Sequence, residues 1–290
     1  MEYRVLESES WETIHECFDE AFSDYAVEMH VPFDKFQNIM LRNGVDLKYS
    51  MGLYDAEKLV GFIVNGTGVW HDLPTVYDSG TGILREYRGK KYSRTLFSRL
   101  RDLLSRTRYQ QYLLEVIQTN IPAYTLYLRE GFTMTRELQC FRIEKERLHR
   151  EDPHCDIQFR TVSVVDWDAV TAFWNAAPSW QNSIPAIERI SSQFEKIAAY
   201  AGGTLTGYGI FGRESGELVH IAVRKDFRKR GIGTALLNEI SSRTQSPGLR
   251  IVNIDGSDKE TTGFLRKRGF ENDVNQFEMI LPLKKRSETS

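Results

Sequence analysis

Hydrophobic positions along the chain predict alternating helices and strands. From Ser93, apolar residues recur every three or four positions, which is the spacing of one buried helix face, and a second such segment begins at Ala235. Short apolar runs at 112–117 and 250–254 follow these segments and predict buried strands. The apolar helix positions are Leu96, Phe97, Leu100, Leu103 and Leu104 in the first segment and Ala235, Leu236, Leu237 and Ile240 in the second. Strands and helices joined by short turns indicate an α+β fold, a mixed α/β sheet covered by helices.

The same pattern occurs twice. Residues 3–18 and 159–174 each begin with an aromatic residue and an arginine, and then carry a Trp, an aliphatic residue three positions later and an aromatic residue after four more. These pairs are Trp11 with Trp167, Ile14 with Val170, and Phe18 with Trp174. Three further matches follow in the same order: Leu59–Phe62 with Leu205–Tyr208, Tyr87-Arg88 with Phe227-Arg228, and Gly131-Phe132 with Gly269-Phe270. Matches in a constant order predict two copies of one fold.

A charged run separates the two copies. Residues 144–153 read EKERLHREDP, and Pro153 ends any helix there. The length of 290 residues suits two domains of about 100–200 residues each. We therefore expect two consecutive domains, residues 1–152 and 153–290.

Composition narrows the class of protein. Hydrophobic residues make up 41% of the chain and charged residues 27%, as in globular proteins, and the formal net charge is -2. This balance gives no reason to expect binding to nucleic acid or to a membrane surface. The three cysteines, Cys17, Cys140 and Cys155, lack metal-ligand spacing, so we expect free thiols and no metal. The N-terminus does not resemble a signal peptide and no apolar stretch approaches the ~20 residues of a membrane span, so we expect a cytoplasmic protein.

The segment 217–240, ELVHIAVRKDFRKRGIGTALLNEI, carries the clearest chemistry. An apolar strand, 218–223, leads into a basic turn with Gly231 and Gly233, and an amphipathic helix follows directly. A turn of this kind presents backbone N–H groups at a helix N-terminus, where phosphate oxygens bind. Glycines allow the backbone to approach such a ligand closely. The spacing fits neither a P-loop nor a dinucleotide fingerprint.

A strand followed by R-x-x-G-x-G and a leucine-rich helix resembles the acetyl-CoA loop of the GNAT acetyltransferase superfamily. In the first copy, Leu114-Glu115-Val116 through Asn120, Ala123, Leu126, Tyr127, Gly131 and Phe132 resembles the second motif of that family. The resemblance implies two GNAT folds in tandem and acetyl-CoA as co-substrate, with the loop amides on the pyrophosphate. It implies cofactor contacts from Ile221, Ala222, Val223, Arg228, Lys229, Arg230, Gly231, Ile232, Gly233 and Thr234.

Each copy departs from the family pattern. In the first copy Lys91 and Ser93 stand at the two glycine positions of the loop, so we expect weak coenzyme A binding there or none. That copy keeps Tyr127, where many members place the acid that protonates the departing thiolate. In the second copy the loop is intact, but Leu265 occupies the tyrosine position and Asp258 replaces Asn120.

Transfer to an amine requires a base, because an alkyl amine with a pKa near ~10 arrives mostly as ammonium. Glu217 is the candidate base, on the strand expected to line the thioester, and a solvated carboxylate at the strand end is the alternative. Tyr127 is the candidate acid, with packing in the core as the alternative. Simple alternation places His220 on the face opposite Glu217, where a structural role is expected. Asp78 is interpreted as a turn residue.

These observations predict an N-acetyltransferase that moves an acetyl group from acetyl-CoA to the amine of a small molecule, as a monomer or homodimer. A protein or peptide acceptor, and a non-catalytic acetyl-CoA sensor or scaffold, are the alternatives. Candidates for an acceptor pocket are Tyr25, Phe33 and Trp70 in the first copy and Trp180 and Asn182 in the second.

Overall fold

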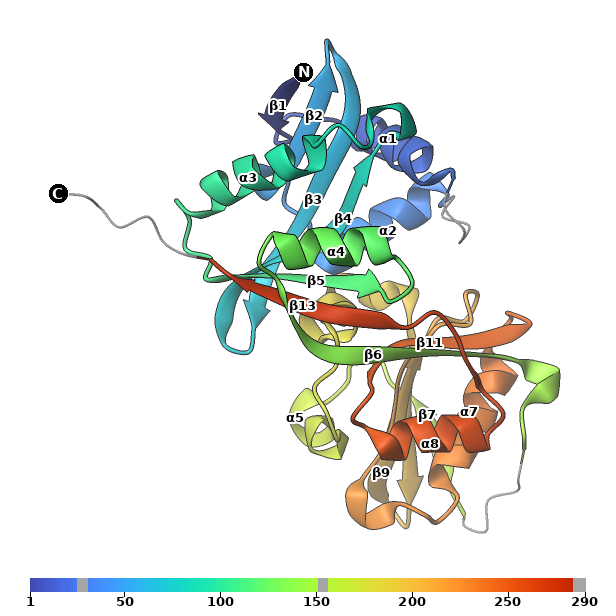
Figure 1. The fold of residues 1–290 in the computed structure, drawn as a ribbon. Helices are drawn as coiled ribbons and strands as arrows, with labels where there is room; N and C mark the ends of the chain where they lie inside the picture. The colour runs from blue at the N-terminus through green and yellow to red at the C-terminus, as the bar shows by residue number, and fades with distance from the viewer. Residues whose placement is uncertain (25–30, 151–155, 284–290) are drawn as a thin grey trace. The chain divides into compact units, whose positions relative to one another are not determined.

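The computed structural model describes residues 1–24, 31–150 and 156–283, which form two compact units (Figure 1). Unit 1 contains Met1–Val116, Asn120–Thr135 and the chain from Glu278, and unit 2 contains Ile117–Thr119 and Arg136–Phe277. Strand β6 (Thr133–Glu144) begins in unit 1 and ends in unit 2, whereas β13 (Gln276–Pro282) runs from unit 2 into unit 1.

The expected division at residues 152 and 153 does not coincide with these units. Each unit contains part of a strand that belongs in sequence to the other copy, so no single cut separates them. The two boundary residues themselves, like Cys155, lie outside the described residues.

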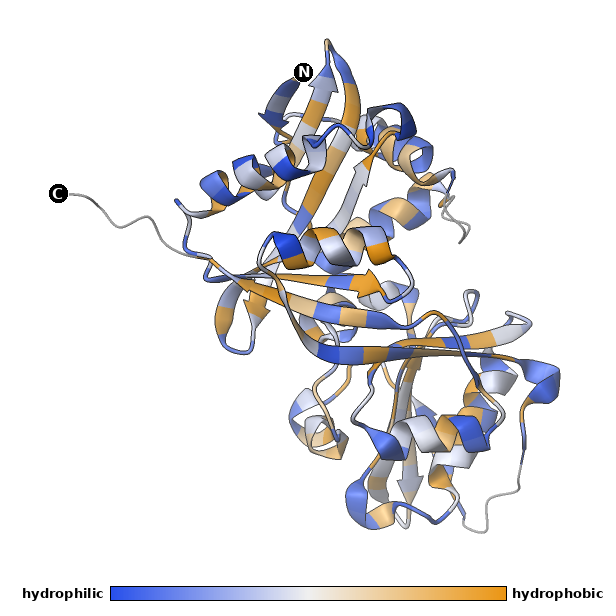
Figure 2. Cartoon of the chain, viewed as in Figure 1, coloured by the Kyte–Doolittle hydropathy of each residue, from blue (hydrophilic) through white to orange (hydrophobic). Residues whose placement is uncertain are grey.

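Unit 1 is built on a mixed sheet. The strands β1 (Glu2–Val5), β2 (Met51–Asp55), β3 (Lys58–Trp70) and β4 (Leu73–Ile83) are antiparallel neighbours in that order. Strand β5 (Gln111–Ile117) then pairs in parallel with β4, through Thr75–Tyr77 and Gln111–Leu113. Orange segments along β3 and β5 in Figure 2 mark the apolar residues that these central strands bury.

The helices of unit 1 contribute two aromatic groups to its core. Helices α1 (Trp11–Phe22) and α2 (Phe33–Asn43) pack against β3 and β4, and bring Phe18 and Phe36 toward Phe62. Helices α3 (Tyr92–Leu104) and α4 (Ile121–Arg129) contribute Phe97 and Tyr127 to a second group that includes Phe132. The helix expected from Ser93 is thus confirmed as α3, and the strand expected at 112–117 as β5.

Unit 2 carries the second set of strands. An antiparallel sheet runs in the order β10 (Leu218–Val223), β9 (Thr204–Phe211), β8 (Glu195–Ala201), β7 (Gln158–Thr161). Strand β11 (Gly248–Asp255) pairs with β6, as does the short β12 (Glu271–Asn272). The strands expected at 218–223 and 250–254 are confirmed as β10 and β11.

Helices cover both faces of the β7–β10 sheet. Helix α7 (Ile232–Arg243), which confirms the amphipathic helix expected from Ala235, packs on one face together with α8 (Lys259–Lys267). On the other face lie α5 (Trp167–Val170) and α6 (Ile184–Arg189). The first helix of this copy is thus one short turn, continued only by the 3₁₀ turn Thr171–Phe173.

The contact between β9 and α7 explains two glycines. A Cβ at Gly207 would lie 2.8 Å from Cδ1 of Leu236, and one at Gly209 would lie 2.7 Å from Cδ1 of Ile240. Side chains at these positions would push the helix off the strand. Successive residues of a strand face opposite sides, so Tyr208 and Ile210 point to the other face. Among the helices of the described chain, none is long and apolar enough to cross a membrane.

Candidate active site

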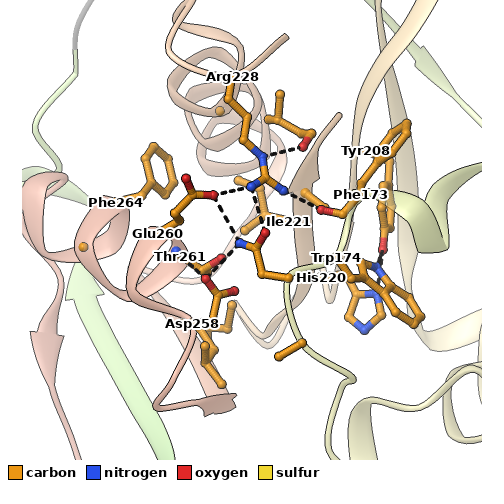
Figure 3. Close-up of a pocket in the computed structure, with 18 of the residues that line it drawn as sticks. Phe173, Trp174, Tyr208, His220, Ile221, Arg228, Asp258, Glu260, Thr261 and Phe264 are labelled. Atoms are coloured by element: carbon orange, nitrogen blue, oxygen red, sulfur yellow. Dashed lines mark hydrogen bonds and ion pairs between the residues drawn. The ribbon is translucent and has the colours of Figure 1, made fainter. Parts of the chain in front are cut away.

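A cavity of about 1230 Å³ lies in unit 2, between the basic loop, β10, β11 and α8. Its wall includes every residue expected to contact coenzyme A, and these residues come from one strand–turn–helix segment. They are Ile221, Ala222, Val223, Arg228, Lys229, Arg230, Gly231, Ile232, Gly233 and Thr234. Figure 3 shows Asp258 and Glu260 on one side of this cavity and Trp174, Tyr208 and His220 on the other.

The cavity opens where two parallel strands separate. Glu217 and Arg250 form an isolated parallel bridge at the start of β10 and β11, and the lining residues 219–223 and 251–255 follow it on the two strands. In unit 1, Tyr77 and Leu113 form the last parallel pair of β4 and β5. Tyr77 and Glu217 both stand ten residues before the aromatic residue of their loop, Tyr87 and Phe227. The two copies therefore share this strand geometry.

Strands β10 and β4, which lead into the two loops, each contain a β-bulge at the same distance from the loop. Val219 is an extra residue between the pairs Leu218–Phe211 and His220–Ile210. In unit 1 the register shifts at Ser79, which like Val219 lies eight residues before the loop aromatic. A bulge interrupts the alternation of side chains along a strand.

The bulge decides which way His220 faces. Leu218 packs with the α7 core, whereas Val219 packs with the core on the opposite face, and His220 bonds to Tyr208 on that same opposite face. The expectation that His220 lies opposite Glu217 rested on unbroken alternation, which the structure does not have between them.

The basic loop has the same backbone in both copies, although the glycines differ. In unit 2 the left-handed conformation occurs at Lys229 (φ 60°) and Gly231 (φ 85°), and in unit 1 at Gly89 (φ 76°) and Lys91 (φ 66°). Glycine adopts this conformation without strain and lysine does not, so each copy carries one strained position. Gly231 and Lys91 are the N-caps of α7 and α3, and neither helix has a side-chain cap.

Arg228 connects this loop to its surroundings. Its guanidinium donates to the carbonyls of Val223 (3.0 Å) and Phe173 (2.6 Å), to Oδ1 of Asn175 (2.8 Å), and to Glu260. These bonds engage the side chain with protein groups at the cavity rim. Across the rim, Asn175 also donates to Oδ1 of Asp258 at 2.9 Å, and Asp258 accepts from the amide of Thr261 as the N-cap of α8.

Four polar groups form a hydrogen-bonded chain on the cavity wall, partly buried at Trp174 and buried at Tyr208, His220 and Asn182. Nε1 of Trp174 lies 2.6 Å from the hydroxyl of Tyr208, which lies 2.9 Å from Nδ1 of His220. Nε2 of His220 lies 2.8 Å from the carbonyl of Asn182. Burial raises the pKa of the Tyr208 hydroxyl above its ordinary value, so Tyr208 is neutral. The rings of Trp167 and Trp174 pack edge-on against the imidazole, with centroids at 6.0 and 5.4 Å.

The two residues expected to be catalytic lie elsewhere. Glu217 is partly exposed at the closed end of the strand pair and is not part of the cavity wall. Tyr127 is buried in unit 1, with ring centroids 5.8 Å from Phe97 and 5.6 Å from Phe132. That environment is the core packing considered above as its alternative role.

Asp78 is not in a turn between elements. It lies within β4 beside the bulge, where it accepts bonds from the Gly80 amide (3.0 Å) and the Thr81 hydroxyl (2.7 Å). Burial raises the pKa of this carboxyl to about 7, although both bonds act to lower it. Asp78 thus bonds to nearby residues of its own chain segment, as expected of a turn residue, but these bonds occur at a bulge within a strand.

Of the residues expected near an acceptor, Asn182 lines the cavity and Trp180 is buried outside its wall. Trp70 is buried and Phe33 partly exposed in unit 1, and Tyr25 lies outside the described residues. The sequence repeat pairs Trp174 with Phe18 and Tyr208 with Phe62, and predicts no site role for either residue of the second copy. Their repeated aromatic positions were the available signal, but their convergence on His220 depends on the bulge.

Comparisons with known proteins agree with this geometry. Residues 168–280 match the family described as "Acetyltransferase (GNAT) domain", and residues 11–132 match "Acetyltransferase (GNAT) family". The chain belongs to the GNAT acetyltransferase superfamily and contains two GNAT domains in tandem, in a mixed α+β fold. It is an N-acetyltransferase that uses acetyl-CoA. A search of curated proteins finds no match.

Solved structures share the fold over nearly the whole chain. A tandem GNAT protein from the clavulanic acid biosynthesis pathway is 11% identical with a TM-score of 0.72, covering 99% of both chains. A GCN5-related N-acetyltransferase from Sphaerobacter thermophilus is 15% identical with a TM-score of 0.68, covering 94% of this chain and 92% of that one. A glucosamine N-acetyltransferase region of a fungal multi-domain β-N-acetylglucosaminidase is 13% identical with a TM-score of 0.68, covering 96% of this chain and 37% of that one.

Proposed function

We propose that unit 2 transfers the acetyl group of acetyl-CoA to the amine of a small-molecule acceptor by direct attack. The observation that carries this proposal is the common cavity. Its wall contains the complete strand–turn–helix segment expected to hold coenzyme A, and beside that segment it is aromatic and polar. The donor and an acceptor can therefore meet in a single cavity.

The loop fits the diphosphate of coenzyme A. The first N–H groups of α7 have no acceptor within the helix, and no side chain caps them. Lys229 and Arg230 are exposed beside this helix end and add positive charge. Helix N-terminus and basic side chains together favour a dianionic group, so this part of the cavity would hold the diphosphate.

The remaining wall suits a compact acceptor. Phe173, Trp174 and Tyr208 supply aromatic surface, and Asn182 supplies an amide. Aromatic faces stabilise an ammonium group that has left bulk water. The structural relative with a glucosamine N-acetyltransferase region makes glucosamine one suitable member of an amine panel. The catalytic roles of Glu217 and Tyr127 stay predictions, and this proposal does not depend on them.

Calorimetric titration with coenzyme A tests the cofactor site. Gly231→Glu should abolish binding, because a carboxylate and a side chain would enter the phosphate site at a residue with φ 85°. Gly203→Glu is the matched control, since Gly203 also has positive φ, has open space around it and is not part of the cavity wall. It should keep the wild-type affinity.

The transferase reaction is tested separately, by mass detection of acetylated products from acetyl-CoA and a panel of amines. We expect at least one small amine to be acetylated by the wild-type chain and not by Gly231→Glu. Unchanged coenzyme A affinity in a folded Gly231→Glu protein would refute the cofactor site, and acetylation of peptides alone would refute the small-molecule acceptor.

A further inference from the structure

The hydrogen-bond chain on the cavity wall has a defined direction. The Asn182 carbonyl can only accept, so Nε2 of His220 carries a proton and donates to it. The indole of Trp174 can only donate, so the Tyr208 oxygen accepts from it. The Tyr208 hydroxyl then donates to Nδ1 of His220, the unprotonated nitrogen of a neutral imidazole.

This arrangement can take up one proton without losing a bond. With Nδ1 protonated, the imidazolium would donate to Tyr208 through Nδ1 and still donate to Asn182 through Nε2. The Tyr208 oxygen would accept that bond, and its own hydroxyl proton would no longer point to His220. A merely structural histidine does not need a neighbour that can reverse its bond in this way.

The chain is also placed beside the reacting part of the cavity. His220 directly precedes Ile221, the first strand residue expected to contact the cofactor, and both line the cavity. The groups that contact the imidazole include Tyr208 from β9, the two tryptophan rings of 167 and 174, and the Asn182 carbonyl. Of these groups, Tyr208 is titratable. The charged residues of the same wall belong to the loop, β11 and α8, namely Arg228, Lys229, Arg230, Asp255, Asp258, Glu260, Lys267 and Arg268.

Resting on the function proposed above, we propose that Tyr208 and His220 together accept the proton of the acceptor amine in unit 2. Tyr208 is the catalytic residue that meets the amine. His220 holds the Tyr208 hydroxyl in place and becomes positively charged when it takes up the Tyr208 proton. In this assignment Glu217 is not the base.

The proton balance is complete. An ammonium R–NH₃⁺ gives one proton to the Tyr208 oxygen while the Tyr208 proton moves to Nδ1 of His220. The neutral amine nitrogen attacks the thioester carbonyl carbon, a C–N bond forms and the C–S bond breaks. The second nitrogen proton goes to the departing thiolate, which leaves as a thiol. His220 afterwards returns its proton to solvent through Tyr208, which restores the starting state.

The test compares kcat/KM as a function of pH in Tyr208→Phe, His220→Asn and wild type, with the amine found by the panel. Both variants should lose about 10²–10⁴-fold at neutral pH, as expected when a general base is removed. The loss should shrink at high pH, where more amine is already neutral. The acid limb of the wild-type profile is caused by protonation of the pair, and in His220→Asn it should be replaced by a rise at higher pH that follows deprotonation of the free amine.

Matched controls separate chemistry from folding. Tyr200→Phe lies on β8 and His149→Asn is exposed, and neither residue lines the cavity. Both should keep the wild-type profile. Coenzyme A affinity should stay within about twofold in Tyr208→Phe and His220→Asn, because neither side chain is in the loop. If the wild-type protein does not bind coenzyme A, or acetylates none of the amines, the function proposed above is overturned instead.

Two results would overturn the assignment of Tyr208 and His220. One is a kcat/KM within about twofold of wild type in both variants with the acid limb retained. The other is a 10²–10⁴-fold loss in Glu217→Gln in their place. If a variant fails to fold, the ¹⁵N chemical shifts of histidine in the wild-type protein still test the direction of the hydrogen-bond chain on which the assignment rests. They should show His220 neutral, with the proton on Nε2, above its acid limb. A proton on Nδ1 of the neutral ring would refute the direction of the chain.

Discussion

At the scale of single residues, the two bulges carry different chemistry. Asp78 directly precedes the bulge of unit 1, and His220 directly follows that of unit 2. Asp78 takes its hydrogen bonds from its own strand, at Gly80 and Thr81. His220 bonds to a neighbouring strand and to the Asn182 segment. The carboxyl therefore stabilises a local distortion, whereas the imidazole connects the parts of a cavity wall.

The buried carboxyl of Asp78 should make stability depend on pH. Its pKa is raised from 3.8 to about 7, mainly by burial, so between pH 4 and 7 the unfolded chain binds fewer protons than the folded one. The free energy of unfolding therefore falls as pH rises through this window. The difference in pKa corresponds to a loss of the order of 4 kcal/mol once Asp78 is ionised in both states.

Asp78→Asn cannot ionise and keeps an acceptor for the Gly80 amide. Relative to wild type, it should gain stability by up to about 4 kcal/mol between pH 4 and pH 8. Denaturant unfolding at both pH values measures this gain. The control Asp72→Asn changes an exposed carboxyl and should follow wild type. Equal pH dependence in all three proteins would show that Asp78 is ionised throughout.

At the scale of elements, a conserved geometry within the chain links loop and helix in both copies. Nε of Arg88 donates to Ile83, and its guanidinium also bonds to the Ala21 carbonyl and Asp24, at the end of α1. Arg228 makes the corresponding bonds to Val223, Phe173 and Asn175. The arginine of the R-x-x-G-x-G pattern thus braces the strand end against the segment after the first helix.

Replacing this brace should destabilise unit 2. Arg228→Lys keeps the charge, but an ammonium cannot reproduce the planar set of donors that reaches both carbonyls and Asn175. Hydrogen bonds to charged groups contribute ~1.5–3 kcal/mol, so a loss of that size is expected in the free energy of unfolding. Arg224→Lys is the control, because its pair with Asp226 is exposed to solvent and contributes little to stability. Equal stability of the two variants would contradict a bracing role.

The elements themselves could be predicted from the sequence because they depend on local periodicity. The spacing of apolar residues located α3, α7, β5, β10 and β11. The bulge at Val219 could not be predicted, because it depends on pairing with β9 and leaves no local signal. It turns His220 toward Tyr208, and so decides which residues form the cavity wall. The path of β6 and β13 through both units also depends on long-range pairing.

At the scale of the whole molecule, the two domains keep one backbone plan with different side chains. The loop of unit 1 places Lys91 where unit 2 has Gly231, in the same left-handed conformation. The cradle is therefore preserved in unit 1, but a side chain stands at the position where the backbone would approach a phosphate. The backbone conformation of the two loops predicts two cofactor sites. Their side chains predict a single strong site, in unit 2.

The number of coenzyme A molecules bound by each chain decides between these alternatives. Calorimetric titration of the wild-type protein should give one strong site. Of the two loops, only that of unit 2 has glycine at the helix N-cap, where no side chain obstructs the approach of a phosphate to the first turn of the helix. The double substitution Lys91→Gly and Ser93→Gly gives unit 1 the glycine pattern of unit 2. It should create a second, weaker site, since the left-handed backbone is already present at residue 91 and the obstructing side chain is gone. Two equal sites in the wild-type protein would show that Lys91 does not obstruct binding, and a double variant with one site would place the defect of unit 1 outside its loop.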